Sequence, residues 1–483
     1  MTDLLPESEN PLTPLMPRRR LWRPACLLIG LGIVILLAGA GIEARIVAHQ
    51  PWAEGLFVPE DVPPPAGAVP VMVRRAPPEN FPSLASWIEG AYGVPADDPD
   101  YRQLVESIRE NEAKTEFILF IPTGAVDLQT ILASGRLPEP GHAEVLAGPL
   151  ARSESFTMDG TRFQAVGRIN PYAGPFLFAY LLPEHDAFRL LFTPESGATQ
   201  GWLHPDGSAA VQAASATPPA NEADETASDS QANPAPLESA SGIGLIGTPL
   251  RLLGIIGLAC AAAGGMLLVT QIWWTLHQRG IHGGTPLLDE IVLRPRFWFG
   301  LHAALYAVFF GAMLAGMGTP LWNMTLTSLV ADIFAKGELS YIGEAYSSAS
   351  VVRAALATFH HNYITATLMF TLLVSIVIPG IGVLKTAASF AFIGFLMAPL
   401  WTSTMNGYSY HCITMALEFE AYILACFAVC VYLVYCYRGL AAGSLLGPFR
   451  RGISCMAGAA LWSGLLLACA AAYEAATLIL LRF

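Results

Sequence analysis

Long apolar runs separated by short polar segments fill the second half of this chain, and one more apolar run stands near its start. A helix of about 20 apolar residues spans the hydrocarbon core of a bilayer. The pattern predicts a polytopic α-helical membrane protein with about seven transmembrane helices. The expected spans are residues 25–44, 243–275, 297–318, 361–383, 386–402, 412–437 and 453–480.

The segment between the first two apolar runs, residues 45–206, has an ordinary mixture of charged, apolar and turn residues. It predicts an α/β domain inserted into the membrane protein. Short apolar or alternating runs bounded by Gly and Pro are typical of strands, and Asp159-Gly160 suits the tight turn of a hairpin. The expected elements are a helix over Tyr101–Lys114 and strands over Phe117–Ile121, Glu144–Ala147, Thr161–Arg168 and Phe176–Leu182.

Residues 207–242 contain no Lys, Arg or aromatic residue. A segment so poor in apolar side chains cannot offset the entropy lost on ordering. It predicts a disordered acidic linker between the inserted domain and the second span. On the far side of the third span, the segment 318–359 predicts two further helices, over Leu321–Ala335 and Ala345–Thr358, lying at the membrane surface.

Arginines in the short polar segments predict the orientation, because loops rich in Lys and Arg stay in the cytoplasm. They occur in the tail 1–24 and in the loops 276–296 and 438–452. Seven spans place all three segments, and a turn at Lys385, on the cytoplasmic side. Residues 45–242 then lie in the periplasm of a bacterium, with the spans in its cytoplasmic (inner) membrane. The first span has the basic flank of a signal peptide, and its length favours an uncleaved signal anchor.

Composition excludes several function classes. The chain is 53% hydrophobic and only 13% charged, and its net charge of −12 argues against a nucleic-acid partner. The eight cysteines lie in or beside apolar segments, without the spacing of a zinc site. No hydrolase or nucleotide-binding motif is present. We therefore expect a protein that is not an enzyme and that holds no cofactor or metal.

Charged side chains inside a span are costly, and each is a candidate for function. Glu418 and Glu420 lie in the sixth predicted span, Glu474 in the seventh and His302 in the third. Two hypotheses remain open: a site that binds an ion or a partner or relays protons, and a set of packing contacts between helices. The expected polar cluster in the outer leaflet consists of Glu418, Glu420, Glu474, His360, His361, Asn362 and His411.

From about Arg296 onward the chain resembles the stage II sporulation protein M (SpoIIM-like) membrane family. The similar motifs, in order, are Asn362-Tyr-Ile-Thr-Ala, Gly380-Ile-Gly382, Phe392-Ile-Gly394-Phe, Glu418-Phe-Glu420-Ala421 and Ala471-Ala-Tyr-Glu474-Ala. In the family a histidine stands four residues before the glutamate. Here Thr414 holds that position, and His411 lies seven residues before Glu418.

The inserted domain resembles the MacB-like periplasmic core domain of type VII ABC-transporter subunits. The resemblance rests on two stretches, residues 134–148 and 155–168. Together the two resemblances imply a membrane scaffold or transport-associated subunit of the cell envelope that recruits protein partners through its periplasmic domain. The alternatives are a permease subunit that works with a separate ATPase, docked on the loop 276–296, and a proton-coupled transporter.

Overall fold

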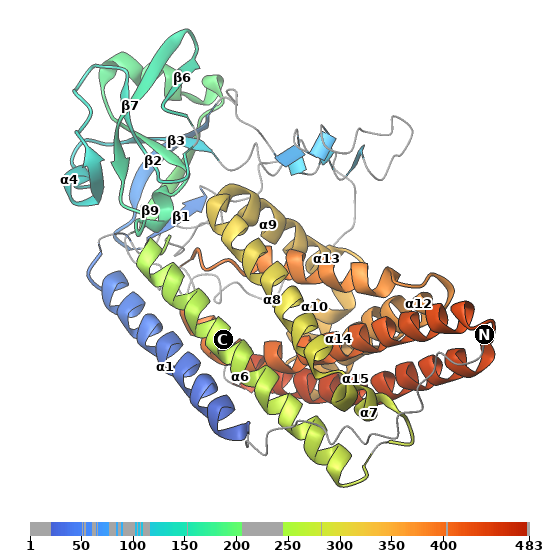
Figure 1. Cartoon of the computed structure of the whole chain (residues 1–483). Coiled ribbons are helices and arrows are strands. Elements are labelled where there is room, and N and C mark those ends of the chain that lie inside the picture. The colour runs from blue at the N-terminus through green and yellow to red at the C-terminus, as the bar shows by residue number, and fades with distance from the viewer. Residues whose placement is uncertain are drawn as a thin grey trace.

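The computed structural model has a β-sheet domain at one end of a helical bundle (Figure 1). The predicted linker 207–242, most of the tail 1–24 and the C-terminal Phe483 lie outside the described residues. The structure describes residues 21–50, 52, 55–59, 64, 66–76, 84–85, 88–89, 102–103, 105–106, 108–109, 116–151, 153–204, 245–281, 283–401 and 404–480.

The sheet is mixed, and its described residues form nine strands in the order β1-β9-β2-β3-β8-β5-β7-β4, with β6 also paired to β7. The pairs β3–β8 and β5–β7 are parallel, and the others are antiparallel. The strands are β1 (Leu56–Pro59), β2 (Val69–Arg75), β3 (Phe117–Ile121), β4 (Leu132–Gly135), β5 (Glu144–Ala147), β6 (Ser155–Met158), β7 (Thr161–Ile169), β8 (Ala179–Pro183) and β9 (Thr199–His204). Short helical turns lie at α4 (Leu128–Ile131), η1 (Gly174–Phe176), η2 (Asp186–Phe192) and η3 (Pro194–Ser196).

Most of the predicted strands are confirmed. The strands β3 and β5 have the expected bounds, and β7 ends one residue later than predicted. The predicted start of β8 at Phe176 is wrong, because Gly174–Phe176 forms the 3-10 turn η1. Asp159 and Gly160 have φ angles of 47° and 79°, which makes the expected tight hairpin turn. Of the helix predicted over Tyr101–Lys114, the described positions between 102 and 109 are helical.

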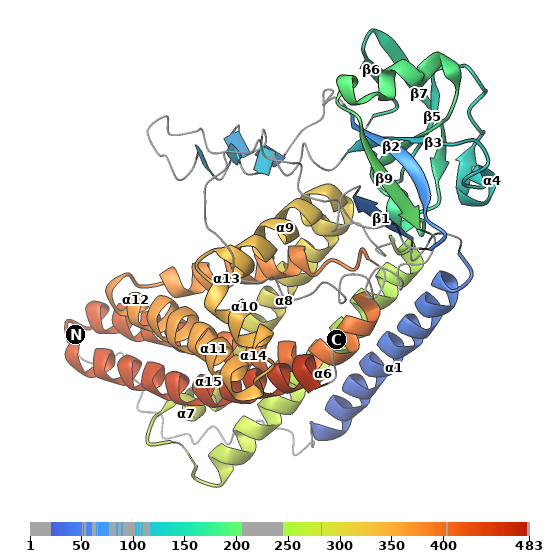
Figure 2. The ribbon, with the colours of Figure 1, turned by 180° about the vertical axis from the view of Figure 1, so that it is seen from behind.

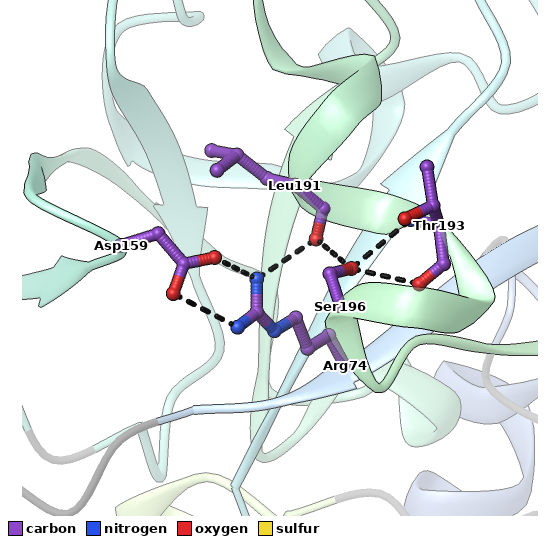
Figure 3. Close-up of polar contacts among 5 residues, drawn as sticks. All are labelled: Arg74, Asp159, Leu191, Thr193 and Ser196. Carbon is purple, nitrogen blue, oxygen red and sulfur yellow. Dashed lines mark hydrogen bonds and ion pairs between the residues drawn. The ribbon is translucent and has the colours of Figure 1, made fainter.

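An ion pair anchors the tip of the β6–β7 hairpin to the sheet (Figure 3). The Arg74 guanidinium on β2 donates to both Asp159 carboxylate oxygens, over 2.6 and 3.2 Å, and to the Leu191 carbonyl over 2.9 Å. Ser196 donates to the same Leu191 carbonyl over 2.8 Å. The Arg74 contact lowers the pKa of the Asp159 carboxyl. The contact thus joins three segments that are distant in sequence.

Among the residues that the structure describes, five helices are long and apolar enough to cross a bilayer, so this is a multi-pass membrane protein: α1, α6, α8, α14 from Gly407, and α15. The helices are α1 (Trp22–Val47), α6 (Thr248–Gln278), α7 (Leu287–Leu293), α8 (Pro295–Gly318), α9 (Pro320–Lys336), α10 (Ser340–Ser347), α11 (Val351–Phe359), the π-helix η5 (His360–Leu373), α12 (Val374–Val377), α13 (Ile381–Leu396), α14 (Thr404–Ala441) and α15 (Leu446–Leu480).

The predicted fourth and fifth spans have different bounds in the structure. α11, η5 and α12 follow one another without a break, so the fourth helical segment begins at Val351 rather than at 361. It ends at Val377, because Pro379 lacks a backbone N–H and Gly380 turns the chain with a φ of 93°. The fifth helix, α13, begins four residues after Val377 and has only 16 residues. The turn predicted at Lys385 therefore lies earlier, at residues 378–380.

Lys385 consequently lies inside the helical bundle rather than in a loop. Its ammonium group donates to the Ala366 carbonyl over 3.1 Å and lies 5.8 Å from the centre of the Tyr422 ring. Of the two helices predicted in segment 318–359, the first is confirmed as α9. The second is two helices, α10 and α11, separated at Ala349, whose φ is 52°.

Small residues allow the helices of the bundle to approach closely, as is usual in membranes. A Cβ atom on Gly32 of α1 would lie 2.6 Å from the Gly257 carbonyl of α6. One on Gly394 of α13 would lie 2.2 Å from the Phe309 carbonyl of α8. Gly316 is equally confined, whereas Gly311 faces open space. These contacts hold α1 against α6 and α13 against α8.

The bundle has two different ends, which Figures 1 and 2 show from opposite sides. At the first, here called the arginine end, the start of α1 meets the end of α6: the Leu21 amide donates to Gln271 Oε1 over 2.9 Å. The sheet domain lies at the other end. There the Leu245 amide donates to the Pro171 carbonyl over 2.7 Å, and the Ile246 amide to the Leu400 carbonyl over 2.8 Å. The two arginine-bearing loops and the sheet domain are thus on opposite ends.

Candidate intramembrane site

The two glutamates of α14 point in different directions, because residues two apart on a helix are separated by about 200° around its axis. Glu420 is fully buried, whereas Glu418 is half-buried. The residues expected to form one polar cluster therefore divide. Glu420 belongs to what we call the histidine group, with His302 and Tyr306. Glu418 belongs to what we call the outer group, with Asn362 and Glu474.

The histidine group joins α8 to α14 in the interior of the bundle. His302 Nε2 lies 2.9 Å from Glu420 Oε2, and both side chains have no exposed surface. The Tyr306 hydroxyl donates to the other Glu420 oxygen, Oε1, over 3.4 Å. Both Glu420 oxygens are therefore satisfied by groups of α8, one helical turn apart.

The contacts of His302 determine how many protons this group holds. His302 Nδ1 lies 2.9 Å from the Trp298 carbonyl oxygen, which can only accept, so Nδ1 carries a hydrogen. A proton must then also lie between Nε2 and Oε2, because two lone pairs would repel each other at 2.9 Å. Whether that proton belongs to the imidazole or to the carboxyl, the pair has no net charge. Neutral pairing of this kind is what a low-dielectric interior favours.

A second layer of contacts fixes the histidine ring. The Trp298 indole N–H donates to Thr270 Oγ1 on α6 over 2.9 Å, and Thr270 donates to the Met266 carbonyl over 2.7 Å. The Trp298 ring meets the His302 ring nearly edge-on at 4.3 Å. The network therefore extends across three helices, α6, α8 and α14, which it holds in register.

The outer group joins the π-helix η5 to α14 and lies beside α15. Asn362 donates to Glu418 Oε1 over 2.8 Å, and Glu474 of α15 is near enough to Glu418 for their carboxylates to interact electrostatically. Asn362 lies in the π-helix η5, whose wider turns often occur at functional sites. Among the described residues, Asn362 is the one side chain that donates to these two carboxylates, so this group is less completely paired than the histidine group.

The three remaining histidines of the expected cluster lie apart from the glutamates. His360 is exposed, and its ring lies 6.4 Å from that of Tyr341. His361 interacts electrostatically with Lys385 rather than with a glutamate. His411 is half-buried and makes no hydrogen bond to any described residue. Within the described ranges, no three His, Cys, Asp or Glu side chains come together in a way that could hold a metal ion.

Sequence reasoning missed a third polar group, which we call the Glu290 clamp, at the arginine end. The Glu290 carboxylate of α7 is 1% exposed and lies 2.9 Å from Arg294 Nε and 3.2 Å from an Arg451 nitrogen. The Tyr435 hydroxyl also donates to it. Both guanidiniums lie over the Tyr435 ring, at 5.7 and 5.6 Å. The clamp ties the loop helix α7 to α14 and α15.

Signals for some of these contacts were present in the sequence. Trp298, His302 and Tyr306 are spaced four residues apart, which puts them on one face of a helix. Glu290 and Arg294 have the same spacing, but they lie in the segment 276–296, which was predicted to be a loop. The partners that join each group to another helix lie more than 50 residues away in the chain, and local spacing does not predict them: Glu420 for His302, Glu418 for Asn362 and Arg451 for Glu290.

Comparison with known proteins finds no family model, curated protein or solved structure that matches the chain. The resemblances to the SpoIIM-like family and to MacB-like domains remain predictions from the motifs that carry them.

Proposed function

We propose that this chain is a non-enzymatic scaffold of a bacterial cytoplasmic membrane that holds its sheet domain in the periplasm and recruits envelope proteins with it. The observation that carries the proposal is the attachment of the sheet domain to the bundle. Both chain connections contribute: Asn170 donates to Gln50 Oε1 over 2.6 Å near the end of α1, and the Gly247 amide donates to the Tyr172 hydroxyl over 3.2 Å before α6. A domain fixed in this way is presented in one orientation relative to the membrane.

The arginines support the proposed orientation. Arg23, Arg279 and Arg450 lie near helix ends at the arginine end, and the sheet domain lies at the opposite end. Because loops rich in arginine stay in the cytoplasm, this arrangement supports a periplasmic position for the sheet domain.

The polar contacts of the bundle favour a scaffold over a transporter. A transporter needs buried polar groups that exchange partners with substrate, ion or water. In the histidine group the carboxylate is matched by donors and the pair is neutral, as is typical of contacts that hold helices together.

Site-specific crosslinking in intact cells tests the proposal. A photoreactive residue at Leu190, which is 83% exposed on the sheet domain, should capture an envelope protein. The same residue at Ser444, exposed at the arginine end, is the matched control. Capture of a periplasmic protein from position 444 would refute the orientation. Purification of the whole chain together with an ATPase would favour the permease alternative, with the ATPase bound at the loop 276–296.

The closeness of Glu418 and Glu474 favours a proton-coupled transporter as the second candidate. Carboxyl groups inside membrane spans form the proton relays of pumps and transporters. Proton flux through vesicles that contain the purified chain, absent from vesicles with Glu418→Gln and Glu474→Gln, would establish this function. Equal flux in vesicles with and without the chain would exclude it.

A further inference from the structure

We propose that the tip of the α14–α15 hairpin, residues 437–450, is a binding surface for the headgroups of anionic phospholipids. This inference goes beyond the scaffold function and holds for either orientation of the chain in the membrane. It rests on the arginines at the arginine end that have no ion-pair partner and on the exposed apolar side chains beside them. It also rests on the position of the tip, where the apolar part of α14 ends.

The charges at the arginine end do not balance internally. The acidic side chains described there are Asp289 and Glu290. Asp289 lies 3.0 Å from His277, and Glu290 is occupied by Arg294 and Arg451. The remaining arginines are exposed and form no ion pair with any described residue: Arg23, Arg279, Arg296, Arg438 and Arg450. This end therefore presents an excess of positive charge.

Two of these arginines lie close together on the hairpin tip. A Cβ on Gly439 would lie 3.1 Å from Leu445 Cα, so these two residues lie at the same level of the hairpin. A Cβ on Gly452 of α15 would lie 2.9 Å from the Tyr432 side chain of α14. The two helices are therefore antiparallel and in close contact. This register places Arg450 about one helical turn, ~6 Å along the axis, from the level of Arg438. No Asp or Glu occurs between Ala421 and Tyr473 to oppose them.

Large apolar side chains surround these arginines. Tyr437 is 75% exposed, Leu440 is 68% exposed and Leu446 is 71% exposed. The apolar part of α14 ends at Tyr437, directly before Arg438. An aromatic residue followed by an arginine marks the boundary between acyl chains and headgroups.

A membrane interface is the environment that satisfies both kinds of side chain. The leucines and Tyr437 enter the edge of the hydrocarbon, while the guanidiniums reach headgroup phosphates, which they bind in a bidentate manner. Basic clusters beside a membrane span attract anionic lipids for this reason. An acidic protein would match the arginines and leave the leucines in water, so we favour the lipid.

Native mass spectrometry of the whole chain in a mild nonionic detergent tests this inference. The chain is titrated with dioleoylphosphatidylglycerol or with dioleoylphosphatidylcholine, and the bound lipid is counted. We expect preferential retention of the anionic lipid. In the double variant Arg438→Gln/Arg450→Gln its affinity should fall about 30-fold, equivalent to ~2 kcal/mol. Raised salt should weaken the wild-type preference as well.

The matched control is Arg75→Gln/Arg162→Gln, which removes the same charge from the sheet domain and should leave lipid binding unchanged. A melting temperature close to that of the wild type shows that the tip variant is folded. Leu440→Ser/Leu446→Ser should lower the affinity for both lipids. Equal retention of the two lipids by the wild type would overturn the proposal. So would an unchanged affinity in the arginine variant, or full displacement of the lipid by millimolar inorganic phosphate.

Discussion

Acid–base pairs occur in both regions of this molecule, at similar distances and in opposite surroundings. In the bundle, His302 and Glu420 meet at 2.9 Å with no exposed surface. In the sheet domain, Arg136 meets Glu144 at 2.5 Å and Arg74 meets Asp159 at 2.6 Å, with part of each side chain in water. Water competes for and screens the exposed pairs, whereas nothing replaces a lost partner in the bundle. The environment of each pair, rather than the distance between its atoms, therefore determines how much the pair contributes to the free energy of unfolding.

The largest effect is expected from Glu420→Ala, which leaves His302 and Tyr306 without their hydrogen-bond partner. We expect a loss of about 2 kcal/mol in the free energy of unfolding in detergent. This lies between the ~0.6–1.7 kcal/mol typical of hydrogen bonds in membranes and the ~3–5 kcal/mol for breaking a buried ion pair in water-soluble proteins. Glu420→Gln is the control, because its amide can still donate to His302 and should restore most of the loss. Equal destabilisation by Ala and Gln would show that the charge, rather than the hydrogen bond, is needed.

A smaller effect is expected from Glu290→Ala. The variant leaves Arg294 and Arg451 without their carboxylate, but both guanidiniums lie at the end of the bundle and can turn to water. We expect a loss of about 1 kcal/mol, and faster hydrogen exchange in α7 than in α8. Asp289→Ala, in the same short helix, is the matched control and should alter exchange less. Unchanged exchange in α7 would mean that its buried leucines suffice to hold it.

The outer group should contribute less to the free energy of unfolding than the Glu290 clamp does. Glu418→Gln keeps a hydrogen-bonding side chain opposite Asn362 and relieves any repulsion from Glu474, so the free energy of unfolding should change by less than about 1 kcal/mol. If the scaffold function is right, the variant should also complement a deletion strain. Failure to complement with full stability would instead assign a chemical role to this carboxyl.

The smallest effect is expected from acid on the sheet domain. The Arg136 side chain lowers the pKa of Glu144 from 4.5 to about 2, so the folded domain holds this carboxylate more strongly ionised than the unfolded chain does. The resulting stabilisation is present above about pH 4.5 and is lost as the pH falls toward 2. A melting series over this range should show less acid sensitivity in Arg136→Gln than in the wild type. Arg75→Gln should behave like the wild type. If Arg136→Gln destabilised the protein at pH 7 as much as Glu420→Ala, the contrast between the two regions would fail.

Local sequence patterns predicted much of the architecture. Apolar runs indicated the five long helices, because a span must satisfy every backbone group within itself. The strand at Phe117–Ile121 and the turn at Asp159-Gly160 were predictable because burial and a left-handed turn restrict the choice of residues. The break at Pro379-Gly380 was missed, although both residues signal one, because the apolar run continues through it.

The sequence by itself determined which segments are apolar, where the arginines lie and which polar groups would have to be buried. Only the tertiary structure decided how those groups pair. Glu418 and Glu420 are two residues apart, and one meets Asn362 while the other meets His302. Lys385 was expected in a loop and instead reaches Ala366 and Tyr422. Pairing depends on how each helix is rotated and shifted against its neighbours. Contacts between distant segments set that rotation, and the local hydrophobic period does not encode it.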